Sequence, residues 1–377
     1  MNEMIENRYI PNSVAPPGET LEEELEALGM TQAELAERTG RPKKTINEII
    51  QGKAAITPET ALQLEQVLGI PASFWNNLER HYQESLARAE ERQRLSRETE
   101  WLKDVPLREM IRRGWLQEQK DKVAQVRELL RYFGVASSEQ WRSFYAQTSP
   151  SFRKSPSFEG APGSVAAWLR RGEVKAQQIQ CAPYDAKKFR EVLRQVRSLT
   201  REGIDVALEE LVRLCASVGV AVVVVPELPK TRVSGAARWL SPAKALIQLS
   251  WRYKRDDQFW FTFFHEAAHI LLHGKRNVYL DGDTNTDTTA NQNNQDSERE
   301  ADNFASDTLI PPTDLQRFIN DMDYRDEVVI EQFATEIGIA PGIVVGKLQH
   351  IEKLAHNQGR SLIQSYSQLS EQEFPRG

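Results

Sequence analysis

Short amphipathic segments follow one another closely at the start of the chain. Apolar residues recur at helical spacing in four segments, 21–28, 32–39, 43–51 and 58–67, and a fifth follows Pro71. Glycines close these segments at positions 29, 40, 52 and 69, as is common at helix C-termini. Thr31 and Glu34 form a T-x-x-E capping box at the start of the second segment. The pattern predicts a compact five-helix domain over residues 1–85.

The hydrophobic pattern changes twice after this domain. Residues 86–205 are helix-forming and heavily charged at first, with Pro106 as the main breaker, and predict a helical connecting region. Runs that are β-branched or alternate in polarity then begin at Val220, Val233 and Ala243. They predict a small, largely antiparallel sheet in a third region, 206–377. The predicted fold class is therefore α+β and mostly helical.

A dense apolar helix follows the predicted sheet, with the sequence FWFTFFHEAAHILLHG from Phe259 to Gly274. Asp256 and Asp257 offer N-terminal capping. His265 and His269 are four residues apart, so both imidazoles point to one side of the helix, where they can bind one metal ion. Glu266 lies beside them and can accept a proton from a water molecule, the role of this residue in the H-E-x-x-H motif of zinc peptidases.

A catalytic zinc site needs a third protein ligand, which we expect from a helix beginning at Ser297 after a long polar stretch. Ser297 and Glu300 form an S-x-x-E capping box, which leaves Glu298 as the predicted ligand and Glu300 as the alternative. Asp302 lies four residues after Glu298 and is placed to orient a ligand imidazole. His273 is expected at the helix C-terminus, interacting with the helix dipole or with solvent rather than with the metal.

Composition narrows the class of protein. The chain has 377 residues, 40% hydrophobic and 27% charged, and a net charge of −6. Its only cysteines, Cys181 and Cys215, argue against a disulfide framework and against cysteine-bound zinc. No apolar run approaches the roughly 18 residues of a membrane span. The first residues lack the features of a secretion signal, so we expect a cytoplasmic protein without a membrane partner.

Charge in the first domain is distributed unevenly. Up to residue 80 there are 13 acidic and seven basic residues, but five of the basic ones fall between positions 38 and 53. These five surround the third helix, where phosphate contacts would be made: Arg38, Arg41, Lys43, Lys44 and Lys53. The second and third helices, joined by a glycine-containing turn, fit a helix-turn-helix. The alternative is a solvated face on a domain that serves dimerisation or partner contact without binding DNA.

The first domain resembles the lambda-repressor-like helix-turn-helix domains, and more closely the HigA antitoxin type, over roughly residues 15–85. The resemblance rests on MTQAELAERTGRPKKTINEIIQGKAAITPETALQLEQVLGIPASFW. It implies that Gln32 lies near a backbone or base contact. It also implies that Lys43, Lys44, Thr45 and Asn47 lie at or near the major groove of a double-stranded operator, with a homodimer as a candidate assembly.

The third region resembles the ImmA/IrrE family of metallopeptidases, from about residue 208 to 354. The resemblance combines the H-E-x-x-H helix with SEREADNFASDTLIPP, in which Glu298, Ala301, Asp302, Phe304 and Ala305 fill the family pattern. It implies a zincin-like domain that binds Zn²⁺ and cleaves a protein partner, such as a repressor or an antitoxin-like regulator. The alternative is a HigA-like antitoxin or repressor whose metal domain serves partner binding or sensing with little hydrolysis. Tyr279 is a candidate for stabilising the oxyanion.

Overall fold

The computed structural model describes residues 15–147, 161–274, 279–282 and 292–366. The chain folds as two compact units, Met1–Thr99 and Glu100–Gly377. The last helix of the first unit, α5 (Ala72–Arg97), continues without a break through position 85, where the sequence suggests a domain boundary. The helical connecting region proposed for residues 86–205 is therefore divided between the two units.

The first unit contains the five predicted helices. Before α5 come α1 (Pro17–Leu28), α2 (Gln32–Thr39), α3 (Lys43–Ile50) and α4 (Pro58–Leu68). The Thr31 hydroxyl accepts the Glu34 N–H at 3.1 Å, so the predicted cap at the start of α2 is present. Gly40 ends α2 with a φ of 68°, a left-handed conformation that glycine adopts without strain, and the chain turns there into α3.

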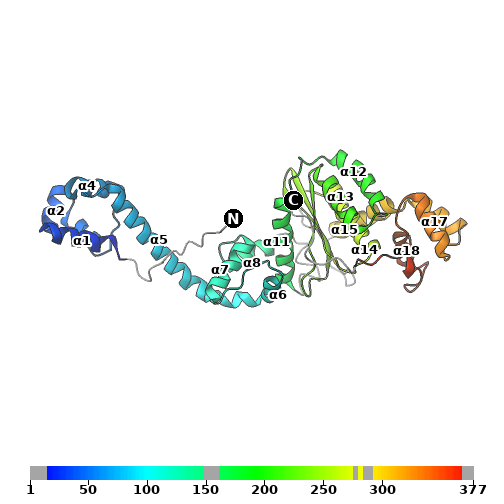
Figure 1. Ribbon diagram of the computed structural model, residues 1–377, viewed down its shortest axis with the longest axis horizontal. Coiled ribbons are helices and arrows are strands. Elements are labelled where there is room, and N and C mark those ends of the chain that lie inside the picture. The colour runs from blue at the N-terminus through cyan, green and yellow to red at the C-terminus, as the bar shows by residue number, and fades with distance from the viewer. Residues whose placement is uncertain (1–14, 148–160, 275–278, 283–291, 367–377) are drawn as a thin grey trace. The chain divides into compact units, whose positions relative to one another are not determined.

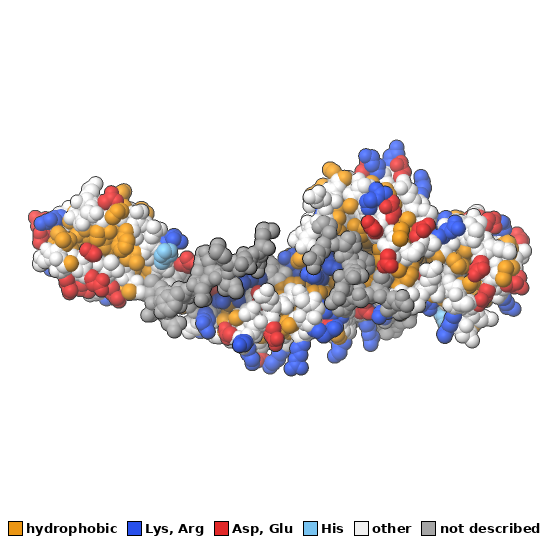
Figure 2. All heavy atoms as spheres, viewed as in Figure 1, with side chains coloured by type: hydrophobic (Ala, Val, Ile, Leu, Met, Phe, Trp, Pro, Cys, Tyr) orange, Lys and Arg blue, Asp and Glu red, His pale blue; other side chains and the backbone are white. Residues whose placement is uncertain are grey.

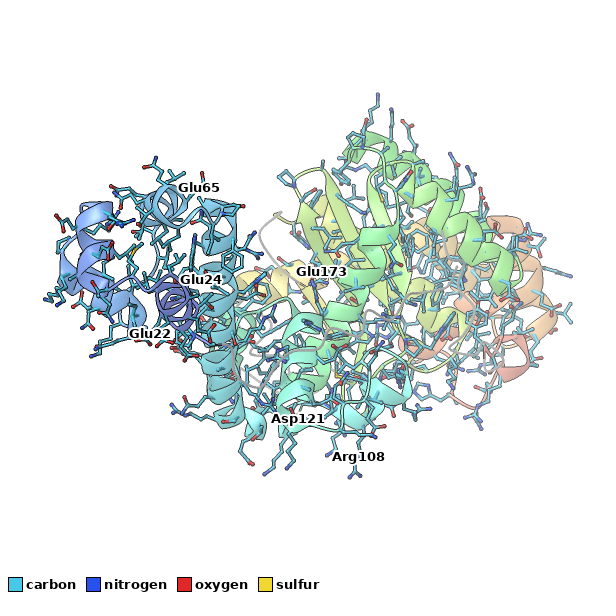
Figure 3. All side chains as sticks on the ribbon, turned by 60° about the vertical axis from the view of Figure 1, so that its left-hand side comes forward. Glu22, Glu24, Glu65, Arg108, Asp121 and Glu173 are labelled. Carbon is cyan, nitrogen blue, oxygen red and sulfur yellow. The ribbon has the colours of Figure 1, made fainter. Side chains whose placement is uncertain are left out.

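Close packing fixes α3 in the first unit. Its apolar face, Ile46, Ile49 and Ile50, is buried in the core of the unit. A Cβ at Gly18 of α1 would lie 2.1 Å from the carbonyl oxygen of Ile49, so only glycine permits this approach. Acidic side chains, by contrast, gather along one edge of the unit (Figure 2), where α1 carries Glu22 and Glu24 (Figure 3). The packing leaves the polar face of α3 available.

The second unit is built around a four-stranded sheet in the order β1-β3-β2-β4. The strands are β1 (Val220–Val224), β2 (Val233–Ser241), β3 (Lys244–Leu249) and β4 (Tyr279–Gly282). β2 is antiparallel to both β3 and β4, but β1 and β3 are parallel. This one pairing differs from the predicted antiparallel sheet, because β3 returns from β2 as a hairpin and inserts between β2 and β1.

Helices cover both faces of this sheet (Figure 1). On one face lies α11 (Pro162–Gln178), where the Trp168 indole N–H donates to the Val225 carbonyl at 2.7 Å. The Gln248 side chain donates to the Trp168 carbonyl on the same face, while its neighbour Ile247 belongs to the core on the other face. This alternation along β3 separates the two faces, as the period of two in a strand requires.

The opposite face is covered by α13 (Ile204–Ala216) and α14 (Asp256–Leu272), with α15 (Gln292–Leu309) packed on α14. The remaining helices of the unit are α6 (Leu107–Arg112), α7 (Lys122–Phe133), α8 (Ser138–Gln147), α12 (Ala186–Leu199), α16 (Pro312–Asp321), α17 (Glu327–Ile337) and α18 (Pro341–His350). The prediction of a mostly helical α+β protein is confirmed.

No single described helix is long and apolar enough to cross a membrane, although the bent pair α17 and α18 meets the length and composition test together.

Candidate metal centre

The predicted metal helix, α14, is buried on most of its surface because the sheet, α15 and α18 pack around it. His265, Glu266 and His269 are exposed by only 3%, 0% and 2%. Asp256 and Asp257 are the first two residues of α14 and lie in its first turn, while Arg255 is the N-cap residue and makes no side-chain cap bond. The capping prediction is therefore wrong in detail, although acids in the first turn still favour the helix dipole.

Three side chains meet on one side of α14. The Nε2 atoms of His265 and His269 lie 3.0 Å apart. Oε2 of Glu298, from α15, lies 3.2 Å from Nε2 of His265 and 3.6 Å from Nε2 of His269. The structure thus brings together the three side chains that the sequence predicts as ligands, in a group with one ligand atom from each within 4.8 Å of the others.

The charge states of these groups suit a divalent metal. Burial lowers the pKa of His269 to about 4, so its imidazole is neutral at pH 7. Burial raises the pKa of Glu298, but the hydrogen bonds and charges of His265 and His269 outweigh it and bring the pKa to about 2. Metal ligands must be deprotonated, and two histidines with one glutamate are a known donor set of catalytic zinc. The site therefore fits Zn²⁺.

The partner of the first histidine is the predicted one. Oδ1 of Asp302 lies 2.9 Å from Nδ1 of His265. A carboxylate at this nitrogen holds the proton on Nδ1 and leaves Nε2 free to face the ligand cluster, which fixes both the tautomer and the ring orientation. Asp302 lies one turn after Glu298 on α15, so a single helix supplies both residues.

The partner of the second histidine was not predicted. Nδ1 of His269 lies 2.8 Å from Nδ1 of His273, and Nε2 of His273 lies 3.2 Å from Oε2 of Glu300. His273 therefore faces the site and not solvent, and its side chain is only 7% exposed. The sequence signal was its spacing, four residues after His269, which places a third imidazole on the same side of the helix.

The predicted role of Glu300 in a capping box is wrong. The helix α15 begins at Gln292, so Ser297 lies inside it and not at its start. The first residues of this helix are asparagine, glutamine and aspartate, which give no apolar period from which a start could be recognised. The loop residues 283–291 lie outside the described residues.

Glu266 lies against the sheet. A Cβ on Gly235, in the middle of β2, would be 2.6 Å from Oε1 of Glu266 and 2.7 Å from Cγ2 of Thr262. Glycine is therefore required where the strand meets the carboxylate. A glycine inside a strand often marks such a close approach, so this contact could have been inferred from the sequence.

The edge of the sheet nearest this glycine is β4, which pairs with β2 through Asp281 opposite Gly235. The predicted peptide-binding edge is therefore formed by β4 and not by the three strands that precede α14. The side chain of Tyr279, the candidate oxyanion donor, lies outside the described residues.

The predicted DNA contacts lie on α2, on α3 and in the turn between them. Lys43 and Lys44 are exposed in the first turn of α3, and Gln32, Thr45 and Asn47 are partly buried. Arg41 is engaged within the unit, since its Nε donates to Gln63 at 2.5 Å and its Nη2 lies 3.2 Å from Glu59. It ties the turn to α4.

Comparison with known proteins covers both units. Residues 21–75 match the helix-turn-helix family and residues 221–349 match the IrrE N-terminal-like domain of peptidase family M78. An uncharacterized HTH-type transcriptional regulator of Escherichia coli, YddM, is 36% identical over 81 residues, which are 22% of this chain and 84% of that protein. Virulence-associated protein A of Dichelobacter nodosus is 42% identical over 52 residues, 14% of this chain and 51% of that protein.

Two solved structures are similar to the same part of the chain. An addiction module antidote protein of the HigA family from Coxiella burnetii has 32% identity and a TM-score of 0.21, over 22% of this chain and 94% of that one. A putative antidote protein of a plasmid maintenance system from Nostoc punctiforme has 29% identity and a TM-score of 0.22, over 22% and 91%.

The class defined by fold and matches is a helix-turn-helix regulator with a peptidase-family domain. The chain belongs to the HTH-type regulators through its first unit, and its second unit contains an IrrE N-terminal-like domain of family M78. The two resemblances inferred from the sequence are thereby confirmed.

Proposed function

We propose that this chain is a cytoplasmic DNA-binding regulator whose second unit is a zinc endopeptidase acting on a protein partner, such as a repressor or an antitoxin-like regulator. The observation that carries the proposal is the meeting of His265, His269 and Glu298 beside the buried carboxylate of Glu266. A scaffold that only bound metal would need the three ligands but would have no use for the neighbouring base.

Each residue has a distinct part in the proposed reaction. Bound Zn²⁺ would supply Lewis acidity toward a water molecule and a peptide carbonyl. Glu266 would hold the water and accept its proton, and later pass that proton to the leaving amine. Asp302 holds Nδ1 of His265, and the pair His273 and Glu300 holds Nδ1 of His269, so both imidazoles keep Nε2 toward the ligand cluster.

The first unit supports the DNA-binding part of the proposal. The two exposed lysines at the start of α3 are placed for phosphate contacts, and Asn47 lies one turn further along the helix. Gln32, Thr45 and Arg41 complete the proposed DNA-contacting set. Because Arg41 is tied to α4, we assign it to supporting the turn as well as to the phosphate backbone. A homodimer on a two-fold operator remains part of the proposal.

The decisive variant is Glu266→Gln, which keeps the shape of the side chain and removes the base. We expect the partner protein to accumulate uncleaved, with a loss of hydrolysis of about 100-fold or more, while zinc content and operator binding stay as in the native chain. Glu331→Gln, an exposed position on α17, is the matched control. Unchanged cleavage in Glu266→Gln would favour the alternative, in which the metal domain serves partner binding or sensing.

A further inference from the structure

A hollow lined by basic side chains lies in the second unit, between two loops. One loop connects β1 to β2 and contributes Glu227, Leu228, Pro229, Lys230 and Arg232, and the other follows β3 and contributes Arg252. Arg113 completes the lining, and the hollow has a volume of about 340 Å³. Four of these residues are cationic and one is acidic, so the hollow has a strong positive bias.

Two of the basic side chains hold the loops in place. Arg113 donates to the carbonyl oxygens of Pro226 and Glu227, at 2.9 and 3.0 Å, and to Glu109 at 2.7 Å. Arg252 donates to the carbonyl oxygen of Arg232 and so joins the second loop to the first. The hollow is therefore a braced feature of the fold.

Backbone strain is concentrated around this hollow. Among the described residues, five that are not glycine have a positive φ, and four of them lie in its two loops: Lys230, Arg232, Tyr253 and Lys254, with φ of 70°, 47°, 71° and 49°. Side chains other than glycine, asparagine and aspartate adopt this conformation at a cost. Retained strain at a cleft is an observation from which function can be inferred.

Lys230 shows the strain most clearly. The Thr231 N–H donates to the Leu228 carbonyl at 3.1 Å, which closes a turn with Pro229 in its second position and Lys230 in its third. A positive φ in the third position is typical of a type II turn, where glycine is favoured. In the part of the chain that the structure describes, no acidic side chain pairs with the Lys230 ammonium group. A lysine here serves the hollow better than it serves the turn.

We propose that this hollow binds a small anion with more than one negative charge, bearing phosphate or carboxylate groups. Guanidinium and ammonium groups are the usual partners of both. The cations converge on a space of small-molecule size and do not follow a stripe, as they would for a nucleic-acid backbone. The site is separate from the metal ligands, and the inference does not rest on the proposed peptidase activity.

The test is calorimetric titration of the full chain with pyrophosphate, and with citrate as the carboxylate arm. Lys230→Gly is expected to relieve the turn and weaken the site together, so Tm rises by roughly 2 °C while Kd for the anion rises about tenfold. Arg252→Gln should also raise Kd. Binding at the metal centre is common to all variants and does not affect the comparison.

Glu352 provides the matched control, because it has a φ of 59° and does not line the hollow. Glu352→Gly should raise Tm and leave Kd unchanged. Citrate and pyrophosphate competing with each other would show that charge alone is recognised, and binding of only one would identify the group. The proposal is overturned if Lys230→Gly and Arg252→Gln bind both anions as the native chain does, if neither anion binds, or if only duplex DNA occupies the hollow when Lys43 and Lys44 are both alanine.

Discussion

The helices α3 and α14 both carry the residues assigned to function, but they hold them in opposite ways. On α3 the apolar residues face the core and the lysines face solvent, so nothing in the unit fixes the lysine head groups in the geometry of a complex. On α14 the functional residues themselves are buried, and each imidazole is held by a second side chain. A site on α3 is completed by its ligand, whereas the site on α14 is organised by the fold.

This difference determines how each site should respond to mutation. Removing an exposed charge removes one contact and leaves the fold intact. Disturbing a buried constellation displaces several groups together, because packed side chains cannot move independently. The following predictions test this contrast, in order of decreasing effect.

The largest effect is expected at Gly235. In Gly235→Ala the new methyl group meets Glu266 and Thr262 at 2.6 and 2.7 Å, so the base must move away from the ligand cluster. Cleavage of the partner protein should fall about 100-fold or more, since small displacements of a catalytic group are costly. Gly203→Ala, where a Cβ would meet nothing within 4 Å, should keep full activity. Normal cleavage by Gly235→Ala would mean that the fold does not organise this site.

The start of α14 offers a test by pH. Burial, with a contribution from Asp257, raises the pKa of Asp256 from 3.8 to about 7. The folded state therefore binds a proton that the unfolded state releases, so stability declines as pH rises from about 4 to about 7 and is level above that. Asp256→Asn does not titrate, and it should be more stable than the native chain at pH 8 by on the order of 3 kcal/mol, but not at pH 4.

Urea unfolding at pH 4 and pH 8 measures this difference. The control is Asp205→Asn, an exposed acid in the first turn of α13, for which we expect a small change at both values. An Asp256→Asn advantage that is equal at the two pH values would contradict the account of a buried, protonated carboxyl group.

The smallest effect is expected on α3. Replacing Lys43 and Lys44 by alanine should weaken operator binding about tenfold and reduce the salt dependence of log K by about two phosphate contacts. The stability of the chain should not change. A matched pair is Lys187 and Lys188, which are likewise exposed at the start of a helix, α12, and whose replacement should leave operator binding as it is. Full binding by the α3 variant would show that this helix does not recognise DNA.

The sequence predicts most of what depends on spacing along one helix. The H-E-x-x-H residues, the five short helices and the choice of Glu298 with Asp302 follow from periodicity and capping rules, and the structure brings the four metal-site residues together. The start of α15 was missed because its first turn is polar, and this hid the contact between His273 and Glu300. The parallel pairing of β1 with β3 depends on how strands meet in space, which local patterns do not encode.

The central claim is that the fold assembles a zinc site from His265, His269 and Glu298. Zinc affinity, measured by competition with a chelator in the Glu298→Ala and Glu300→Ala variants, tests it most directly. We predict that one equivalent of Zn²⁺ binds the native chain, that Glu298→Ala lowers the affinity by about 1,000-fold, and that Glu300→Ala, which acts only through His273, lowers it about tenfold. Tight zinc binding by Glu298→Ala together with its loss in Glu300→Ala would contradict the account.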